Sequence, residues 1–330
     1  MSRFKSIGIV LAIGLTMGIL LTAGIIFAAP RADITLVVEE TAEEEPVGPS
    51  RAELIMTTLA KVYPWRIERA EFRNDDWALL MGGIWYYYAN GAMLPEDLVE
   101  RASEFTSSFG IYNYQSELPP WREPTAEENE RYRQQESSRN NNTANNSRNT
   151  NNETRPQRQR SYHFHEGLWQ AGSHAESSQR VTVIRFLGNS LTIHRGIVEV
   201  LGLVEARIRD AARVDQEVQA WIDSIGTMHG WNWRNVANSQ SRSYHSYGIA
   251  IDILPKSLGG KETYWQWAAQ GGREYWNIPY EDRYHPPDAV IKAFEAYGFM
   301  WGGKWARFDT MHFEYRPEVF IMSGLPLEMP

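Results

Sequence analysis

The stretch from Arg242 to Asp252 contains an imidazole and a carboxylate, His245 and Asp252, that lie seven positions apart across a turn of small residues. Divalent zinc accepts His nitrogens and Asp oxygens at about 2.0–2.2 Å, and a hydrolytic zinc site uses three protein ligands and keeps one position for water. His245 and Asp252 would supply two of these ligands, so a third is needed from another part of the chain.

The later part of the chain offers two further histidines, His285 and His312. His312 lies in an apolar segment and has a carboxylate, Asp309, three residues before it. We therefore predict that His312 is the third metal ligand and that Asp309 is the base that accepts a proton from the attacking water. Glu314, two residues after His312, is the alternative base.

Two patterns in this half of the chain resemble the M15 metallopeptidases. The first is Ser-x-His-x-x-Gly-x-Ala-x-Asp, from Ser243 to Asp252, and the second is Asp-x-x-His-Phe-Glu at 309–314. The likeness is to the D-alanyl-D-alanine carboxypeptidase and VanY-like branch, within the wider group that includes lysostaphin and hedgehog domains. It extends to Gly226, to 233–235 and to 298–305, and it covers roughly the last half of the chain.

The resemblance implies an α+β fold with a small mixed or antiparallel sheet and flanking helices, which holds Zn²⁺ through His245, Asp252 and His312. It implies a zinc metallopeptidase that hydrolyses peptidoglycan stem peptides, with D-alanyl-D-alanine carboxypeptidase as the first expectation. An L-Ala-D-Glu-type endopeptidase and a zinc-containing wall-binding module without catalysis are the alternatives. Many family members have Glu at the position of Asp309, so Asp309 and Glu314 both stay open as the base.

Arg234 lies eleven residues before His245, where VanY-like sequences have a similar Trp-Arg pair. A guanidinium binds a carboxylate through two parallel N–H groups. The resemblance therefore implies that Arg234 binds a carboxylate of the substrate, either a free C-terminus or a D-Glu side chain. Without the resemblance, an exposed arginine would be read as a solvated surface group.

The composition excludes several classes of protein. The net charge of −8 provides no basic surface, so nucleic acid is not an expected partner. The absence of cysteine excludes disulfides, a thiol nucleophile and Cys-bound zinc, so a metal would be held by His and carboxylates. The oligomeric state is not predicted.

Residues 7–29 contain no charged side chain, while Arg3 and Lys5 precede them and an acidic run follows. A helix of this length can cross the ~30 Å hydrocarbon core of a membrane. The basic flank favours the cytoplasmic side, so the rest of the chain is expected outside the cytoplasm. We predict a transmembrane anchor within residues 1–29. Cleavage as a signal peptide, which would make the protein secreted, is the alternative.

Composition divides the rest of the chain into four parts. Residues 30–50 are rich in Pro and Glu and are predicted as a spacer. Residues 51–123 are predicted as a small helical domain of unknown role, with helices over 51–63, over 76–88 and from Pro95 onward. The Asn- and Arg-rich residues 124–160 are predicted as a disordered linker. Residues 161–330 then form the peptidase domain.

Other histidines and aromatic residues have less specific readings. The aromatic run 85–88 is either a platform for sugar rings or part of a core, and aromatic side chains are commonest in cores. His163 and His165 would point the same way on a strand and could bind a metal, although a strand edge is the simpler interpretation. A hairpin is predicted with its turn at 187–190, and His194, which follows it, is expected to be structural.

Overall fold

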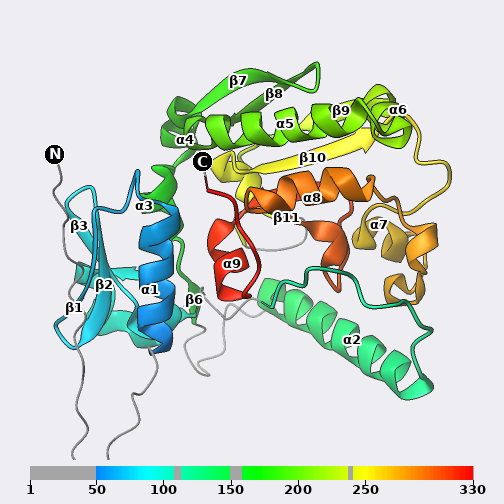
Figure 1. Ribbon diagram of the computed structural model, residues 1–330. Helices are drawn as coiled ribbons and strands as arrows, with labels where there is room; N and C mark the ends of the chain where they lie inside the picture. Colours follow the sequence, from blue (N-terminus) through cyan, green and yellow to red (C-terminus); the bar gives the residue numbers. More distant parts are fainter. Residues whose placement is uncertain (1–49, 108–112, 149–157, 237–240, 330) are drawn as a thin grey trace, which may run out of the picture. The chain divides into compact units, whose positions relative to one another are not determined.

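The computed structural model describes residues 50–107, 113–148, 158–236 and 241–329 (Figure 1). The predicted membrane segment and nearly all of the predicted spacer lie outside these residues. Within the described ranges, no helix combines the length and the apolar character that crossing a membrane requires.

A four-stranded antiparallel sheet forms the framework of the predicted peptidase domain, with strand order β11-β12-β10-β9. Its central pair is β10 (Ala250–Pro255) and β12 (His312–Tyr315), and both strands are largely buried. The outer strands are β9 (Ile225–His229) and β11 (Phe299–Trp301). Before these strands in the sequence, β7 (Val181–Phe186) and β8 (Asn189–His194) pair as an antiparallel hairpin. The structure therefore confirms the hairpin that the sequence predicts.

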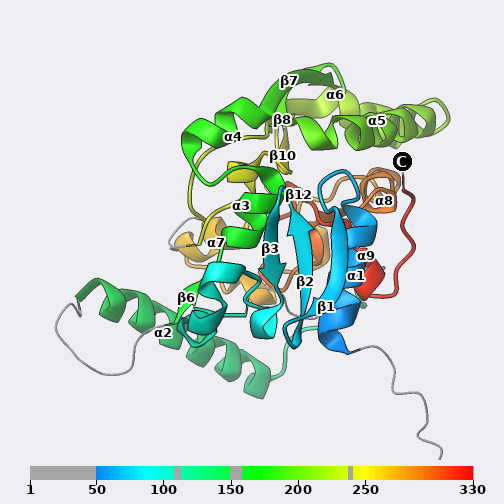
Figure 2. The same cartoon turned by 90° about the vertical axis from the view of Figure 1, so that its left-hand side faces the viewer.

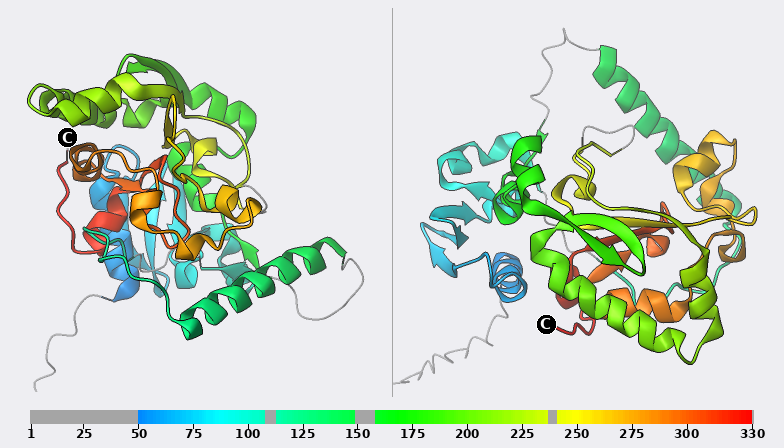
Figure 3. Two further views of the ribbon diagram at one scale, coloured as in Figure 1. Left: turned by 90° about the vertical axis from the view of Figure 1, so that its right-hand side faces the viewer. Right: turned by 90° about the horizontal axis from the view of Figure 1, so that it is seen from above.

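Helices pack on this framework and contribute apolar side chains to its core. The long helix α5 (Val198–Ala212) runs along the β7–β8 hairpin and also packs against α8 (Figure 3). Helix α8 begins directly after Pro287. The remaining helices of this part are α3 (His163–Trp169), α4 (His174–Arg180), α6 (Gln216–Ser224), α7 (Trp265–Gln270), α8 (Asp288–Ala296) and α9 (Pro317–Met322).

The N-terminal described part contains a second antiparallel sheet, so its prediction as a purely helical region is wrong. Helix α1 (Arg51–Val62) is confirmed, but residues 76–88 form two strands in place of a helix. Gly82 and Gly83 have φ angles of 57° and 78°, which glycine adopts without steric cost, and they turn the chain into a hairpin. Figure 2 shows α1 beside the sheet strands β1 (Arg69–Arg73), β2 (Asp76–Met81) and β3 (Ile84–Tyr87). The short strand β4 (Leu94–Pro95) completes this sheet.

Residues 96–104 form a 3₁₀ helix in place of the α-helix predicted from Pro95. The next segment contributes β5 (Phe105–Thr106), which pairs in parallel with β6 (Gln159–Arg160). The aromatic run 85–88 belongs to the core and not to a sugar platform, because Tyr86 and Tyr87 are buried.

The prediction of a disordered linker over 124–160 is wrong for residues 126–148, which form helix α2 (Ala126–Arg148). Contacts of its side chains fix its first half to the peptidase domain. Tyr132 stacks on Trp276, and Glu136 accepts hydrogen bonds from Tyr275 and Arg307. These contacts offset the entropic cost of ordering the helix, which its polar residues alone would not offset. Residues 149–157 lie outside the described part of the chain.

The described residues share one main hydrophobic core, which joins the two parts that the sequence analysis separates. Ile55, Leu59 and Val62 of α1 belong to the same cluster of buried side chains as Ile251 and Phe313 of the central sheet. Residues 51–107 are therefore part of the same folded unit as the peptidase domain and not a separate domain on a linker.

Candidate metal centre

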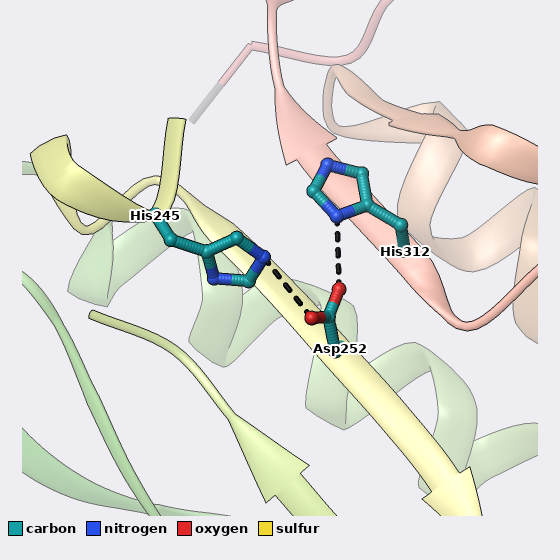
Figure 4. Close-up of side chains that lie close together, drawn as sticks. All are labelled: His245, Asp252 and His312. Atoms are coloured by element: carbon teal, nitrogen blue, oxygen red, sulfur yellow. Dashed lines mark hydrogen bonds and ion pairs between the residues drawn. The ribbon is translucent and has the colours of Figure 1, made fainter. Parts of the chain in front are cut away.

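The three predicted ligands lie together at one end of the central sheet (Figure 4). His245 Nε2 lies 3.2 Å from Asp252 Oδ2, and His312 Nδ1 lies 2.9 Å from Asp252 Oδ1. One ligand atom from each residue lies within 4.8 Å of the other two, and all three side chains are buried. One ion could contact all three, although they come from residues as far as 67 positions apart in the sequence.

Strand register brings Asp252 and His312 together. β10 and β12 are antiparallel, and Asp252 pairs directly with His312. Directly opposed residues of neighbouring strands project from the same face of a sheet, with Cβ atoms about 4.5–5.5 Å apart. The carboxylate and the imidazole therefore meet without any unusual backbone geometry.

His245 reaches the same point from a single 3₁₀ turn, η4 (Tyr244–Tyr247), just before β10. Ser243 caps this turn, because its hydroxyl accepts a hydrogen bond from the backbone N–H of His245. Gly248 ends the turn with φ at 72°, and a Cβ there would lie 2.8 Å from the backbone nitrogen of His194. Glycine is thus required both for the left-handed conformation and for the space.

The ring of His245 is oriented by a backbone carbonyl. Its Nδ1 lies 2.6 Å from the oxygen of Gly230, which can only accept, so Nδ1 carries the proton. In the neutral ring Nε2 then presents a lone pair toward Asp252. This nitrogen is buried and has no hydrogen-bond partner among the described residues, despite its closeness to the carboxylate. A cation between Nε2 and the carboxylate would satisfy both groups.

His312 is held between two carboxylates. Its Nδ1 faces Asp252, and its Nε2 donates a 3.2 Å hydrogen bond to Glu314. Burial opposes protonation, but the hydrogen bonds to Asp252 and Glu314 raise the pKa of His312 well above its ordinary value. A metal bound at Nδ1 would therefore take the place of a proton.

Asp252 carries the negative charge of the cluster. Burial alone would raise its pKa, but the hydrogen bonds and charges of His245 and His312 hold the pKa well below the usual range. Two imidazole nitrogens and one ionised carboxylate are a donor set that zinc accepts, and further positions stay available for water. The residues present fit a zinc ion.

Glu314 belongs to a buried network that continues behind His312. Its Oε1 lies 3.6 Å from Nη1 of Arg316, whose Nε donates to Glu318. Tyr63 of α1 donates a 2.7 Å hydrogen bond to the same Glu318. Carboxylates that accept from the far nitrogen of a metal-ligating histidine orient that ring. The position of Glu314 fits this task better than proton transfer.

Asp309, the first candidate for the base, lines the same cavity as the three ligands. The cavity measures about 510 Å³. One carboxylate oxygen of Asp309, Oδ1, is buried and has no hydrogen-bond partner among the described residues. Burial raises the pKa of Asp309 to about 7, although the charges of His312 and Arg234 oppose the shift. A carboxyl group with this pKa can both accept and return a proton near neutral pH.

Arg234 lies on the loop after β9, at the junction of this cavity with a second one of about 450 Å³. Both cavities are also lined by His245 and Asp252, so Arg234 borders the cluster from an exposed position. Ser246 fixes the loop, because its hydroxyl accepts from the backbone N–H of Arg234 and donates to its carbonyl. No carboxylate of the described residues lies within ion-pair distance of this guanidinium.

His229 is a site residue that the sequence analysis missed. It pairs with Asp252 across β9 and β10 and lines both cavities. No local pattern marks it, because its closeness to the cluster depends on the pairing of two strands more than twenty residues apart. The carbonyl of Gly230, next to it, was missed for the same reason.

The other histidines belong to the framework. His163 and His165 lie on helix α3 and not on a strand, so they point in different directions, and His165 is buried against Tyr244 and Tyr247. His194 is structural, as expected. Its Nε2 donates to the carbonyl of Trp169, and its Nδ1 accepts from the backbone N–H of Gly196.

Comparison with known families gives two matches, one in each part of the chain. Residues 55–109 match a family model described as a domain of unknown function (DUF8518). Residues 237–315, which include all three candidate ligands, match a model of the M15 peptidases described as D-alanyl-D-alanine carboxypeptidase. No curated protein and no solved structure matches the chain. Together with the converged His–Asp–His cluster, the second match identifies residues 237–315 as belonging to the M15 peptidase family.

Proposed function

We propose that this protein is a zinc-dependent peptidase that hydrolyses peptidoglycan stem peptides, and specifically a D-alanyl-D-alanine carboxypeptidase. The observation that carries the proposal is the convergence of His245, Asp252 and His312, with a buried unpartnered nitrogen, inside the segment that matches the carboxypeptidase model. Zinc held there would act as a Lewis acid that lowers the pKa of water and polarises the scissile carbonyl.

The chain's own residues then have distinct tasks. Asp309 accepts a proton from the attacking water and returns it to the leaving amine, which its pKa of about 7 allows. Gly230 and Glu314 hold the two imidazoles in the orientation that directs one nitrogen of each toward Asp252.

Arg234 binds the C-terminal carboxylate of the substrate. The support is its exposed position beside His245 and Asp252 and the lack of a carboxylate within ion-pair distance among the described residues. A guanidinium matches a carboxylate through two N–H groups, so a peptide with a free C-terminus is favoured over an internal bond.

A second candidate activity is endopeptidase cleavage, for example of an L-Ala-D-Glu-type bond. The observation that favours it is the presence of two cavities, of about 450 and 510 Å³, that are both lined by His245 and Asp252. A substrate that continues past the scissile bond in both directions would use both cavities, while a carboxypeptidase substrate ends soon after the bond.

The third candidate is a zinc-containing module that binds the wall without catalysis. Asp309 argues against it, because a carboxyl group with a pKa of about 7 beside the cluster has no use in a purely structural zinc site. We further propose that the protein acts outside the cytoplasm, with residues 7–29 as an anchor or signal segment. This rests on the apolar run alone.

The test is to incubate the zinc-loaded full chain with a stem pentapeptide that ends in D-Ala-D-Ala and to weigh the products. We expect loss of one alanine, abolished by a chelator, restored by zinc and absent in His245→Ala. Cleavage at an internal bond would support the endopeptidase. A stoichiometric zinc content without cleavage of pentapeptide or intact wall fragments would support the binding module.

A further inference from the structure

A third cavity, of about 820 Å³, adjoins the metal centre and is not used by the reaction described above. It lies between the segment 113–124, the beginning of α2, the loop 276–283 and residues 300–306. Its wall combines aromatic rings with the buried guanidinium of Arg283. The principal residues are Trp121, Tyr132, Trp276, Tyr280, Arg283 and Trp305. We call this cavity the aromatic groove.

The aromatic groove continues into the metal cleft. Trp305 and Glu314 line both cavities. The ring of Trp305 lies 5.4 Å from the ring of His312, and Glu314 accepts the hydrogen bond from His312 Nε2. A molecule in the aromatic groove would therefore lie directly beside a peptide bound at the metal centre, separated from it only by residues that touch both.

The groove is held open by contacts within the folded unit. Tyr114 fixes the segment 113–124, because its hydroxyl donates to Glu295 and accepts from the backbone N–H of Trp301. Elsewhere in the lining, Tyr132 stacks on Trp276 with ring centroids 5.5 Å apart. Binding there needs little rearrangement, and preformed sites avoid the entropic cost of ordering.

Arg283 indicates that the ligand carries oxygen acceptors. Its side chain is 9% exposed, and its Nε and Nη2 both donate to the carbonyl of Ile278. It packs over the rings of Phe308 and Tyr280 at 4.2 and 5.0 Å. No carboxylate of the described chain lies within ion-pair distance of Arg283, although buried cations are usually paired. Its remaining N–H groups suit oxygen atoms of a bound molecule.

The groove also holds charged groups of both signs at its rim. Arg122 and Glu128 form an ion pair through two hydrogen bonds of 2.7 and 2.6 Å. Lys304 also lines the groove and is paired with Glu295. A sugar ring has an apolar face of C–H groups and a rim of hydroxyls that both donate and accept. An apolar peptide would leave Arg283 without acceptors, and a small anion would not use the aromatic rings. A saccharide matches both features of the wall.

We propose that the aromatic groove binds the amino-sugar disaccharide to which the stem peptide is attached, so that the preferred substrate is glycan-linked peptide and not free peptide. This inference rests on the proposed function for the identity of the peptide. The groove holds the sugars, and the metal cleft beside Trp305 receives the peptide that extends from them.

The experiment uses the zinc-loaded full chain and two substrates with the same pentapeptide, one free and one attached to the disaccharide. We expect kcat/KM to be about tenfold higher for the disaccharide-linked peptide, the size of effect that one or two aromatic contacts produce. Trp121→Ala and Arg283→Lys should remove most of this advantage and leave kcat/KM for the free peptide unchanged within about twofold. Phe72→Ala, an exposed aromatic on β1, is the control and should keep the advantage.

Equal kcat/KM for both substrates in the parent, or equal losses on both substrates in Trp121→Ala, would overturn the proposal. A second measurement does not need turnover. Calorimetry on the full chain measures the binding of the peptide-free disaccharide. The groove would be supported if the parent and Phe72→Ala bind the disaccharide while Trp121→Ala and Arg283→Lys bind it more weakly. This holds even if neither peptide is cut, because a lack of cleavage would contradict only the proposed peptidase activity. No binding of the disaccharide would overturn the groove.

Discussion

Three carboxylates, those of Asp252, Asp309 and Glu314, line the same cavity as His312, and their surroundings give them three different properties. Asp252 stays ionised, because the two imidazoles hold its pKa well below the usual range. Asp309 has a pKa of about 7, because it is buried without a hydrogen-bond partner for Oδ1 among the described residues. Glu314 accepts a hydrogen bond from His312 and is flanked by Arg316. The roles that we propose divide in the same way, into ligand, base and orienting group.

Replacement of Asp309 separates the base from the ligands. We expect Asp309→Asn to lower kcat by about 10²–10⁴-fold, the usual contribution of a general base, without loss of zinc. Glu314→Gln should instead weaken zinc binding by about 10–100-fold, as changes behind a ligating histidine do. Steady-state kinetics and metal analysis of both variants check this. Full zinc content with abolished turnover in Glu314→Gln would make Glu314 the base.

Replacement of Arg234 tests the recognition of the C-terminus. A hydrogen bond to a charged group is worth about 1.5–3 kcal/mol, so Arg234→Ala should lower kcat/KM for a peptide acid by about 10–100-fold. The same peptide with a C-terminal amide should be cut equally slowly by parent and variant. Arg213→Ala, at an exposed arginine away from the site, is the matched control. Equal losses on acid and amide would exclude carboxylate binding by Arg234.

At the scale of elements, the turn around His194 joins the β7–β8 hairpin to helix α5. Burial lowers the pKa of His194 to about 4, although its hydrogen bond to the carbonyl of Trp169 opposes the shift. An unfolded histidine has a pKa of about 6.5, so the unfolded chain binds the extra proton between these values. This turn therefore contributes stability above pH ~6.5 that is lost as the pH falls toward about 4.

As the pH falls from about 6.5 to about 4, we expect the protonation of His194 to lower the free energy of unfolding by about 3 kcal/mol. His194→Gln should have a lower stability at pH 7 and a flatter pH dependence than the parent. His174→Gln, at an exposed histidine, should follow the parent curve. Denaturant unfolding of the three proteins at several pH values makes the comparison. Identical slopes for parent and His194→Gln would contradict the assignment.

The elements that the sequence predicts well are those fixed by local signals. The turn from Ser243 to Gly248 is recognisable because a capping serine and a glycine stand at its two ends. The strand pair β2–β3 was missed, because apolar residues in a run this short fit a helix as well as a strand, and the two glycines decide between them. Helix α2 was missed because its order depends on Tyr132 and Glu136 contacting residues more than 130 positions away.

The same distinction separates the site residues that could be predicted from those that could not. His245, Asp252, His312 and Asp309 could be predicted, because short patterns and a family resemblance contain them. His229 and the carbonyl of Gly230 could not, because strand pairing and a loop crossing bring them to the cluster.

At the scale of the whole molecule, the peptidase domain depends on residues that belong to a different family model. Helix α1 buries Ile55, Met56, Leu59 and Val62 in the shared core. Each large apolar side chain contributes about 1.5–3 kcal/mol when fully buried, and the net stability of a domain is only about 5–15 kcal/mol. Without α1, the remaining fold would also expose the apolar surface that this helix covers.

We therefore expect a fragment of residues 161–330 to unfold at a much lower temperature than the full chain, or to lack a cooperative transition. Thermal unfolding followed by circular dichroism, together with zinc binding, measures the difference. The full chain treated in parallel is the reference. A fragment with the melting temperature and the zinc affinity of the full chain would show that the shared core is dispensable.

Tyr63 closes a chain of contacts that runs through Glu318, Arg316 and Glu314 to His312. The family boundaries at 109 and 237 thus fall within a single folded unit. Modular recombination is constrained as a result. A hybrid protein in which an unrelated wall-targeting module replaces residues 51–109 would inherit every metal ligand and still lack the scaffold that keeps them aligned.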